Sequence, residues 1–306
     1  MRRIAFVFPG QGSQAVGMGR ELGAESPRWS EASAALGFDL RRLCFEGPES
    51  ELMLTANTQP AILTASILAL DALASAGVTC DFVAGHSLGE YSALVAADGL
   101  GFADAVRTVR ARGQFMQDAV PAGAGAMAAV LGLSREPVTQ ACAEAQAVGP
   151  VQVANLNGPG QTVIAGATAA VQRAVEIAKA KGAKRAVLLP VSAPFHSSLL
   201  APAAERLAGV LAGIQFRDLR MPLISNVDAA PLTAAGRIAD VLIRQVTAPV
   251  RWEEVVQRLA KEGVTACVEV GPGKVLAGLI RRIAPDVTVL NVEDPASLRV
   301  TLEALR

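Results

Sequence analysis

Short apolar runs that end in glycine-rich turns alternate along this chain with longer segments of helical character. Residues 4–8 form one such run and stop at Pro9-Gly10, and residues 81–85 form another that leads into the turn at 85–89. Each pattern predicts a strand, a tight turn and the start of a helix. Between them, residues 60–76 favour a helix with Pro60 in its first turn. This alternation is typical of an α/β fold in which helices flank a parallel sheet.

The middle of the chain follows a different order. It divides into strand, helix, strand, strand, helix and strand, at residues 125–131, 135–147, 151–155, 161–166, 169–181 and 185–190. That order is the ferredoxin-like pattern. Glycines and prolines mark its two ends, at Gly123, Gly125, Pro190 and Pro194. We therefore expect a small domain at 123–191, inserted into a large domain that residues 1–122 and 192–306 form together.

The composition is typical of an α/β enzyme and argues against some kinds of binding partner. The chain has 306 residues, of which 51% are apolar and 18% charged, so it can bury a sizeable core. Lys plus Arg equals Asp plus Glu at 28 each, so no field of one sign would attract nucleic acid or an anionic membrane. The apolar stretch at 61–70 is much shorter than the roughly 20 residues of a spanning helix, and the run at 4–8 is too short for a signal peptide. We expect a cytoplasmic protein that binds neither nucleic acid nor membrane.

The cysteines indicate no metal site. Cys44, Cys80, Cys142 and Cys267 are far apart in sequence and form no C-x-x-C pair. This spacing favours neither a zinc site nor a disulfide framework. We expect buried, unreactive thiols in a reducing compartment.

The turn Gly85-His86-Ser87-Leu88-Gly89 has the G-x-S-x-G spacing of a nucleophile elbow. Small residues two positions before and after the serine allow a strained turn between strand and helix, which lifts the hydroxyl clear of the sheet. The alternatives are a chance match in a glycine-rich chain and a serine that merely caps a helix. The predicted strand before the motif and the predicted helix after it favour a nucleophile at Ser87.

A serine hydroxyl needs an adjacent base, most often histidine, and this chain has two histidines. His86 immediately precedes Ser87, so its side chain should leave the backbone in another direction and serve as a structural donor in the turn. His196 lies in a loop just after the expected small domain, where it could return to the cleft of the large domain. A lone histidine is often only a polar surface or core residue, but together with the elbow His196 is the candidate base.

Two glycine-rich loops resemble phosphate cradles but fail the spacing tests. Gly12 and Gly17 have the gap of a P-loop, but Met18-Gly19 stands where Lys and then Ser or Thr are required, and the loop at 269–274 also lacks that Ser or Thr. The backbone N–H of Gln11 could instead face an oxyanion, together with the N–H of Leu88 at the helix start. An ordinary strand-to-helix connection is the alternative.

Several segments together resemble the malonyl-coenzyme A:acyl carrier protein transacylases over nearly the whole chain. They are Pro9-Gly10-Gln11-Gly12-Ser13-Gln14, Gly85-His86-Ser87-Leu88-Gly89-Glu90-Tyr91, Arg110-Ala111-Arg112-Gly113, Asn155-Leu156-Asn157-Gly158-Pro159-Gly160-Gln161, Pro194-Phe195-His196-Ser197, Arg244-Gln245, Pro249-Val250-Arg251-Trp252 and Glu269-Val270-Gly271-Pro272-Gly273-Lys274-Val275-Leu276. The resemblance implies a hydrolase-like large domain with a ferredoxin-like insertion.

The resemblance also implies a role for each site residue. Ser87 would be the nucleophile, His196 the base, and the amides of Gln11 and Leu88 the oxyanion hole. Arg112 would bind the malonyl carboxylate, although the helix predicted at 106–120 would by itself favour a solvated arginine. The further roles are substrate contacts at Asn155, Asn157 and Phe195, and a main-chain carbonyl at Gln245 that orients the histidine in place of an acid. Phe195 would also fill the space of a branched acyl group.

The activity implied is transfer of a malonyl group from malonyl-coenzyme A to the phosphopantetheine thiol of an acyl carrier protein, through an acyl-serine and without metal or redox cofactor. Fatty acid synthesis would use the product. We expect a monomer whose acidic carrier docks on Lys184-Arg185 and Arg281-Arg282. Three alternatives stay open: an α/β-hydrolase esterase or thioesterase, a polyketide-pathway malonyl transferase, and an acyl-binding module without chemistry.

Overall fold

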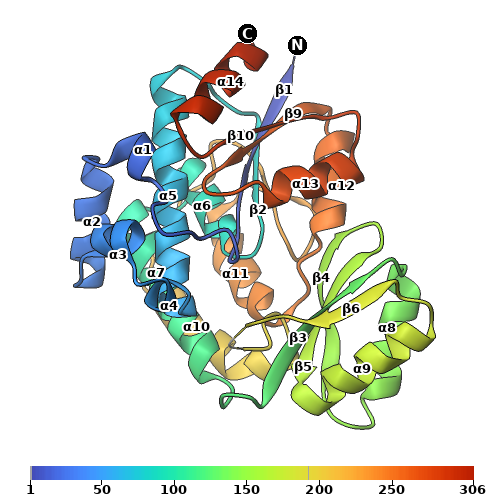
Figure 1. Ribbon diagram of the computed structural model, residues 1–306. Helices are drawn as coiled ribbons and strands as arrows, with labels where there is room; N and C mark the ends of the chain where they lie inside the picture. The colour runs from blue at the N-terminus through green and yellow to red at the C-terminus, as the bar shows by residue number, and fades with distance from the viewer. Residues whose placement is uncertain (1, 192) are drawn as a thin grey trace.

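A mostly parallel six-stranded sheet forms the centre of the larger part of the molecule (Figure 1). The computed structural model describes residues 2–191 and 193–306. The strand order is β10-β9-β1-β2-β7-β8, and every neighbouring pair is parallel except β7 with β8. The strands are β1 (Arg3–Phe8), β2 (Phe82–Gly85), β7 (Leu223–Ile224), β8 (Pro231–Leu232), β9 (Val264–Val270) and β10 (Thr288–Val292). The predicted α/β class and parallel sheet are confirmed, with one antiparallel strand at an edge.

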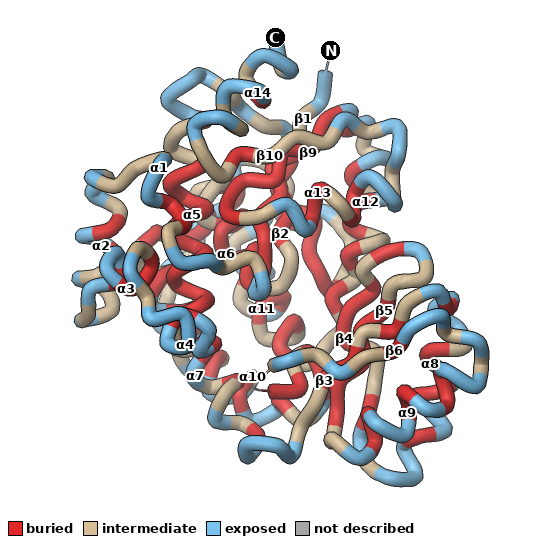
Figure 2. Tube along the Cα trace, viewed as in Figure 1, coloured by how far each residue is buried: buried red, intermediate tan, exposed pale blue. Residues whose placement is uncertain are grey.

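Helices cover both faces of this sheet. They are α1 (Arg20–Gly23), α2 (Pro27–Leu36), α3 (Leu40–Glu46), α4 (Glu49–Leu52), α5 (Thr55–Ser75), α6 (Gly89–Ala96), α7 (Phe102–Asp118), α10 (Ala201–Leu211), α11 (Ile238–Thr247), α12 (Trp252–Lys261), α13 (Val275–Ile283) and α14 (Pro295–Leu305), with short 3₁₀ turns at Ser198–Leu200 and Ala235–Arg237. Figure 2 shows the buried segments concentrated in the strands and in the helices packed on them.

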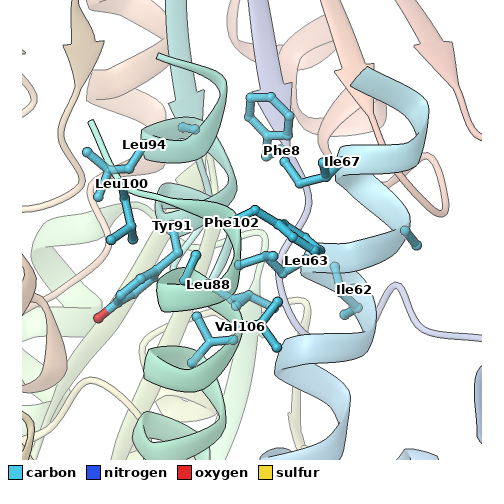
Figure 3. Close-up of a cluster of buried hydrophobic side chains, with 14 of the residues drawn as sticks. Phe8, Ile62, Leu63, Ile67, Leu88, Tyr91, Leu94, Leu100, Phe102 and Val106 are labelled. Atoms are coloured by element: carbon cyan, nitrogen blue, oxygen red, sulfur yellow. The ribbon is translucent and has the colours of Figure 1, made fainter. Parts of the chain in front are cut away.

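The alternation of side chains along β1 divides the core into two layers. Phe6 and Phe8 point to a cluster that includes α5, α6 and α7, whereas Ala5 and Val7 point to a second cluster with α12 and α13. Successive residues of a strand face opposite sides of a sheet, so a run that is apolar at every position requires helices on both sides. Figure 3 shows Phe8 in the first cluster, beside Ile67 of α5.

Helix α5 begins earlier than the apolar pattern predicted. Pro60 is inside the helix rather than in its first turn, because α5 starts at Thr55. The first residues of α5 are polar, and their groups bond to the preceding turn: the Thr58 hydroxyl donates to Leu52 O (2.6 Å) and the Asn57 amide to Glu51 O (2.7 Å). By length and composition α5 could span a membrane, but 72% of its most apolar stretch is buried, so it is a core helix of this fold.

The second sheet has four strands in the order β4-β5-β3-β6, and each neighbouring pair is antiparallel. Its elements are β3 (Gly125–Leu131), α8 (Arg135–Ala145), β4 (Val151–Gly158), β5 (Gln161–Ala167), α9 (Thr168–Ala180) and β6 (Arg185–Leu188). This is the ferredoxin-like arrangement predicted from the element order. The domain limits 123–191 stay a prediction, and Met1 and Ser192, which begin the two predicted segments of the large domain, lie outside the described residues.

The edge strand β4 joins the small sheet to the large domain. The Leu156 N–H donates to Val250 O (2.8 Å), and the Val250 N–H donates to Ala154 O (2.9 Å). Asn155 and Val250 thereby form a parallel bridge just before α12. The two parts of the molecule are therefore connected by backbone hydrogen bonds as well as by the chain itself.

The four cysteines are free thiols. Cys44, Cys142 and Cys267 are buried and Cys80 is half-buried. Burial raises the pKa of each thiol to about 12, which keeps it protonated and unreactive at neutral pH.

Candidate active site

The turn between β2 and α6 brings Ser87 to the carboxyl edge of the sheet in a left-handed backbone conformation, with φ 51°. A Cβ at Gly85 would lie 1.9 Å from the carbonyl carbon of Gly89, and a Cβ at Gly89 would lie 2.0 Å from Phe8 O. A side chain at Gly85 would therefore collide with the first turn of α6, and one at Gly89 would push that helix away from β1. The spacing of the motif follows from these two close approaches.

His196 lies against the serine hydroxyl. Its Nε2 is 2.8 Å from Ser87 Oγ, and its Nδ1 is 2.8 Å from the main-chain oxygen of Gln245. Because a carbonyl can only accept, Nδ1 carries the hydrogen and Nε2 presents its lone pair to the serine hydroxyl. The structure therefore brings together Ser87, His196 and the Gln245 carbonyl, for which the resemblance implies the roles of nucleophile, base and orienting group.

The imidazole of His196 is neutral at physiological pH. Its residue is only 3% exposed. Burial lowers the pKa to about 3, and the positive charge of Arg112 acts in the same direction. A neutral ring is the form that can accept the serine proton.

Arg112 is 1% exposed, which contradicts the solvated position that the helix pattern alone favoured. Its Nη1 donates to Gln59 Oε1 (2.9 Å), while Nη2 donates to Gln245 Oε1 (2.9 Å) and to Ser87 Oγ (3.1 Å). The burial arises from the close packing of α7 on α5, where a Cβ at Gly113 would lie 2.7 Å from Thr55 O. All three acceptors are neutral, so the guanidinium can still pair with an anion.

Three buried polar residues behind the elbow were not found from the sequence: Gln59, Glu90 and Asn226. The Ser87 N–H donates to Asn226 Oδ1 (2.7 Å), and the Asn226 amide donates to the carbonyl of Gly85 (2.6 Å). Glu90 accepts from the Asn226 N–H (3.2 Å) and from the Gln245 amide. Burial raises the Glu90 pKa to about 8. Glu90 could have been noticed as an acid within an apolar helix, whereas nothing in the local sequence distinguishes Asn226.

His86 has the structural position expected for it. Its Nε2–H donates to Asn157 Oδ1 (2.8 Å), and its ring lies 5.6 Å from that of Trp252. Burial lowers its pKa. Asn157, expected to contact substrate, is thus held by the elbow itself.

The dyad opens into a cavity of about 490 Å³. Besides Ser87, His196 and Arg112, the lining includes the other expected site residues Gln11, Leu88, Asn155, Asn157 and Phe195. The remaining wall is largely apolar, with Met116, Met127 and Leu279 among its residues. Such a cavity suits a flexible ligand with one charged end. Among the described residues, no group of three His, Cys, Asp or Glu could hold a metal ion.

The four expected docking residues are exposed outside this cavity. Lys184 directly precedes β6 and Arg185 begins it, and the strand leads to Leu189 and Pro190 on the cavity wall. Arg281 and Arg282 end α13, the helix whose first turn also lines the cavity.

The charge state of His196 can be tested directly. We expect no titration of its ring between pH 5 and 8, because burial and Arg112 both oppose protonation. Arg112→Met removes a positive charge, so the His196 pKa should rise toward the ordinary value of about 6.5. Nitrogen NMR of the His86 and His196 rings measures the pKa of each ring in the unsubstituted chain and in Arg112→Met. His86, whose lowered pKa has no contribution from Arg112, is the internal control. A ring at position 196 that is charged at pH 6 in the unsubstituted chain would contradict the assignment.

Comparison with known proteins agrees with this geometry. Residues 5–296 match the acyl transferase domain family. The malonyl CoA-acyl carrier protein transacylase of Bacillus subtilis is 50% identical, in an alignment that covers 100% of this chain and 98% of the relative. That of Escherichia coli K12 is 49% identical, over 99% of this chain and 100% of the relative. The crystal structure of the acyl-carrier-protein S-malonyltransferase from Burkholderia pseudomallei is 51% identical, with a TM-score of 0.96 over 98% of this chain and 99% of its own. A malonyl-transacylase solved with its type II PKS acyl-carrier protein is 46% identical, also with a TM-score of 0.96, over 99% of both chains. The chain belongs to the acyl transferase domain family and, within it, to the malonyl-CoA–acyl carrier protein transacylases.

Proposed function

We propose that this chain transfers malonyl groups from malonyl-coenzyme A to the phosphopantetheine thiol of an acyl carrier protein, through a malonyl ester on Ser87, and so supplies extender units for fatty acid synthesis. One observation carries the proposal: Ser87 Oγ is 2.8 Å from the base nitrogen of His196 and 3.1 Å from the buried guanidinium of Arg112. A nucleophile between a base and a buried cation suits an acyl donor that ends in a carboxylate. The relatives' names point to the same donor and carrier.

In the first half-reaction, Ser87 Oγ attacks the thioester carbonyl while His196 Nε2 takes the hydroxyl proton. The amides of Gln11 and Leu88 stabilise the oxyanion of the tetrahedral intermediate. The intermediate collapses with cleavage of the carbon–sulfur bond, and His196 returns the proton to the coenzyme A thiol. Arg112 holds the free carboxylate throughout, and Asn155 and Asn157 contact the donor.

In the second half-reaction, His196 takes the proton of the phosphopantetheine thiol, whose sulfur attacks the malonyl ester. Ser87 leaves with the proton returned from His196. One thioester replaces another, so the equilibrium lies near balance and the kinetics are ping-pong. No metal or redox cofactor takes part in either step.

Arg112 favours this reaction over hydrolysis by an ordinary esterase, because a buried cation beside the nucleophile rejects acyl groups that lack an anionic end. The intact dyad likewise favours an enzyme over an acyl-binding module. A polyketide carrier is the second candidate partner, because one relative was solved with such a carrier. Comparing transfer rates to a fatty acid carrier and a polyketide carrier decides between them.

We further propose that the enzyme is a cytoplasmic monomer that binds neither nucleic acid nor membrane. Its zero formal net charge and its free thiols support this. Light scattering of the purified chain measures the oligomeric state, and a dimer mass would overturn the monomer.

Replacing the nucleophile tests the proposed function itself. Mixing the chain with malonyl-coenzyme A should add one malonyl mass, and Ser87→Ala should remove that adduct while the fold remains. His196→Ala should slow acylation by several orders of magnitude, since nucleophile and base act as a unit. Ser92→Ala is the control and should acylate normally, because it removes a buried α6 hydroxyl that has no hydrogen-bond partner among the described residues. Rapid release of free malonate would instead indicate an esterase, and a malonylated Ser87→Ala chain would refute the nucleophile.

Arg112→Ala tests the basis of malonyl selection. The malonyl carboxylate would be buried without a partner, which weakens the binding of the malonyl group by about 2–5 kcal/mol, the cost of breaking a desolvated charge pair. Acetyl-coenzyme A has no such carboxylate and should lose little. We therefore expect kcat/KM to shift in favour of acetyl. An equal fall for both donors would make Arg112 structural.

We propose that Phe195, which lines the cavity beside the base, excludes branched acyl groups. Phe195→Ser should raise the ratio of methylmalonyl to malonyl transfer about tenfold, the effect of one methyl group in a tight pocket. Competition between the two donors measures the ratio, and an unchanged value rejects the steric role.

The exposed cations Lys184, Arg185, Arg281 and Arg282 are proposed to dock the acidic carrier beside the cavity. Arg281→Glu with Arg282→Glu should raise the KM for carrier while leaving that for malonyl-coenzyme A nearly unchanged. Arg299→Glu with Arg306→Glu, which reverses two exposed cations on α14 and at its C-terminal end, is the matched control for net charge. Equal effects on the two KM values would remove the docking role.

A further inference from the structure

Gln152 lies on the edge strand β4 of the small sheet and bonds to both backbone segments that hold the base. Its Nε2 donates to His196 O (3.3 Å) and to Thr247 O (3.1 Å). Its Oε1 accepts from the Ser198 N–H (3.0 Å). One side-chain amide thus joins the loop of the base to the end of α11, two residues beyond Gln245.

The base needs such support for two reasons. His196 has φ 58°, a left-handed conformation that a non-glycine residue keeps only where its surroundings impose it. In addition, the ring is oriented by the Gln245 carbonyl (2.8 Å), and no carboxylate hydrogen-bonds to it in the described part of the chain. The relative position of two backbone segments therefore fixes the ring, where many serine enzymes use an acidic side chain.

We propose that Gln152 is a positioning residue for the dyad of Ser87 and His196. By binding the carbonyls of His196 and Thr247 with one amide, the inserted domain fixes the distance between the imidazole and the carbonyl that orients it. The proposal rests on the function proposed above. Gln152 supports proton transfer by positioning His196, whereas Arg112 recognises the malonyl carboxylate. Loss of Gln152 therefore slows the reaction with every acyl donor alike.

The test uses Gln152→Glu, which keeps the side-chain length and the acceptor for Ser198 but turns the donor into an oxygen facing two carbonyls. We expect the acylation rate constant to fall about 10- to 100-fold with malonyl- and acetyl-coenzyme A alike. A catalytic group that is misplaced by up to about one ångström loses rate by such a factor. The KM for malonyl-coenzyme A should change little. Rapid-quench measurement of the acyl-enzyme gives both constants.

Gln146→Glu is the matched control. Gln146 lies in the same domain and donates to Val151 O (3.4 Å), not to the base loop, so its acylation rates should stay close to those of the unsubstituted chain.

Three results would overturn the proposal: an unchanged rate in Gln152→Glu, a malonyl rate that falls far more than the acetyl rate, or a fall of the same size in Gln146→Glu. If Gln152→Glu does not fold, Gln152→Met replaces it, because this variant removes all three hydrogen bonds at similar length. Loss of the fold in both variants would make Gln152 purely structural. Failure of the proposed function would look different, since the unsubstituted chain would then form no malonyl-serine.

Discussion

The buried charge of Arg112 is the constraint on which the rest of the site depends. Taking a guanidinium out of water is costly unless its hydrogens find acceptors, and here the acceptors are amide and hydroxyl oxygens of Gln59, Gln245 and Ser87. These oxygens accept from both Nη atoms without neutralising the charge, whereas the buried Nε has no hydrogen-bond partner among the described residues. The nearby buried acid, Glu90, is separated from Arg112 by the side chain of Gln245. The cation thus remains open to an anion from outside, and burial together with this charge lowers the pKa of His196 and keeps its ring neutral.

Gln245 connects the parts of the site, because each of its polar groups has a different task. Its main-chain oxygen orients His196, its side-chain oxygen accepts from Arg112, and its side-chain nitrogen donates to the Ser87 carbonyl (3.0 Å) and to Glu90. His196, Arg112 and Ser87 therefore share one residue of α11, so a shift of that helix would disturb all three at once. The end of the helix is also bonded to the small domain, through Gln152.

The sequence was most informative where the requirement is local. The strand, turn and helix around the G-x-S-x-G motif follow one another in the chain, as the close approach of Gly85 to Gly89 requires, and the order of elements in 123–191 is enough for a ferredoxin-like sheet. Arg112 was different: helical periodicity placed it in solvent, and only the packing of α7 on α5 buries it. Asn226 and Gln152 act through segments far away in the chain, so no local pattern marks them. The start of α5 was missed because its first turn is polar.

The four protonated cysteines have a consequence for an enzyme whose substrates and products are both thioesters. Any ionised thiol on the chain could attack a bound or passing thioester and hold the acyl group on the protein as a thioester outside the reaction path. Burial keeps Cys44, Cys80, Cys142 and Cys267 in the unreactive form. Sulfur nucleophiles then come only from coenzyme A and the carrier, so the ester proposed on Ser87 would differ chemically from the thioesters that the enzyme interconverts.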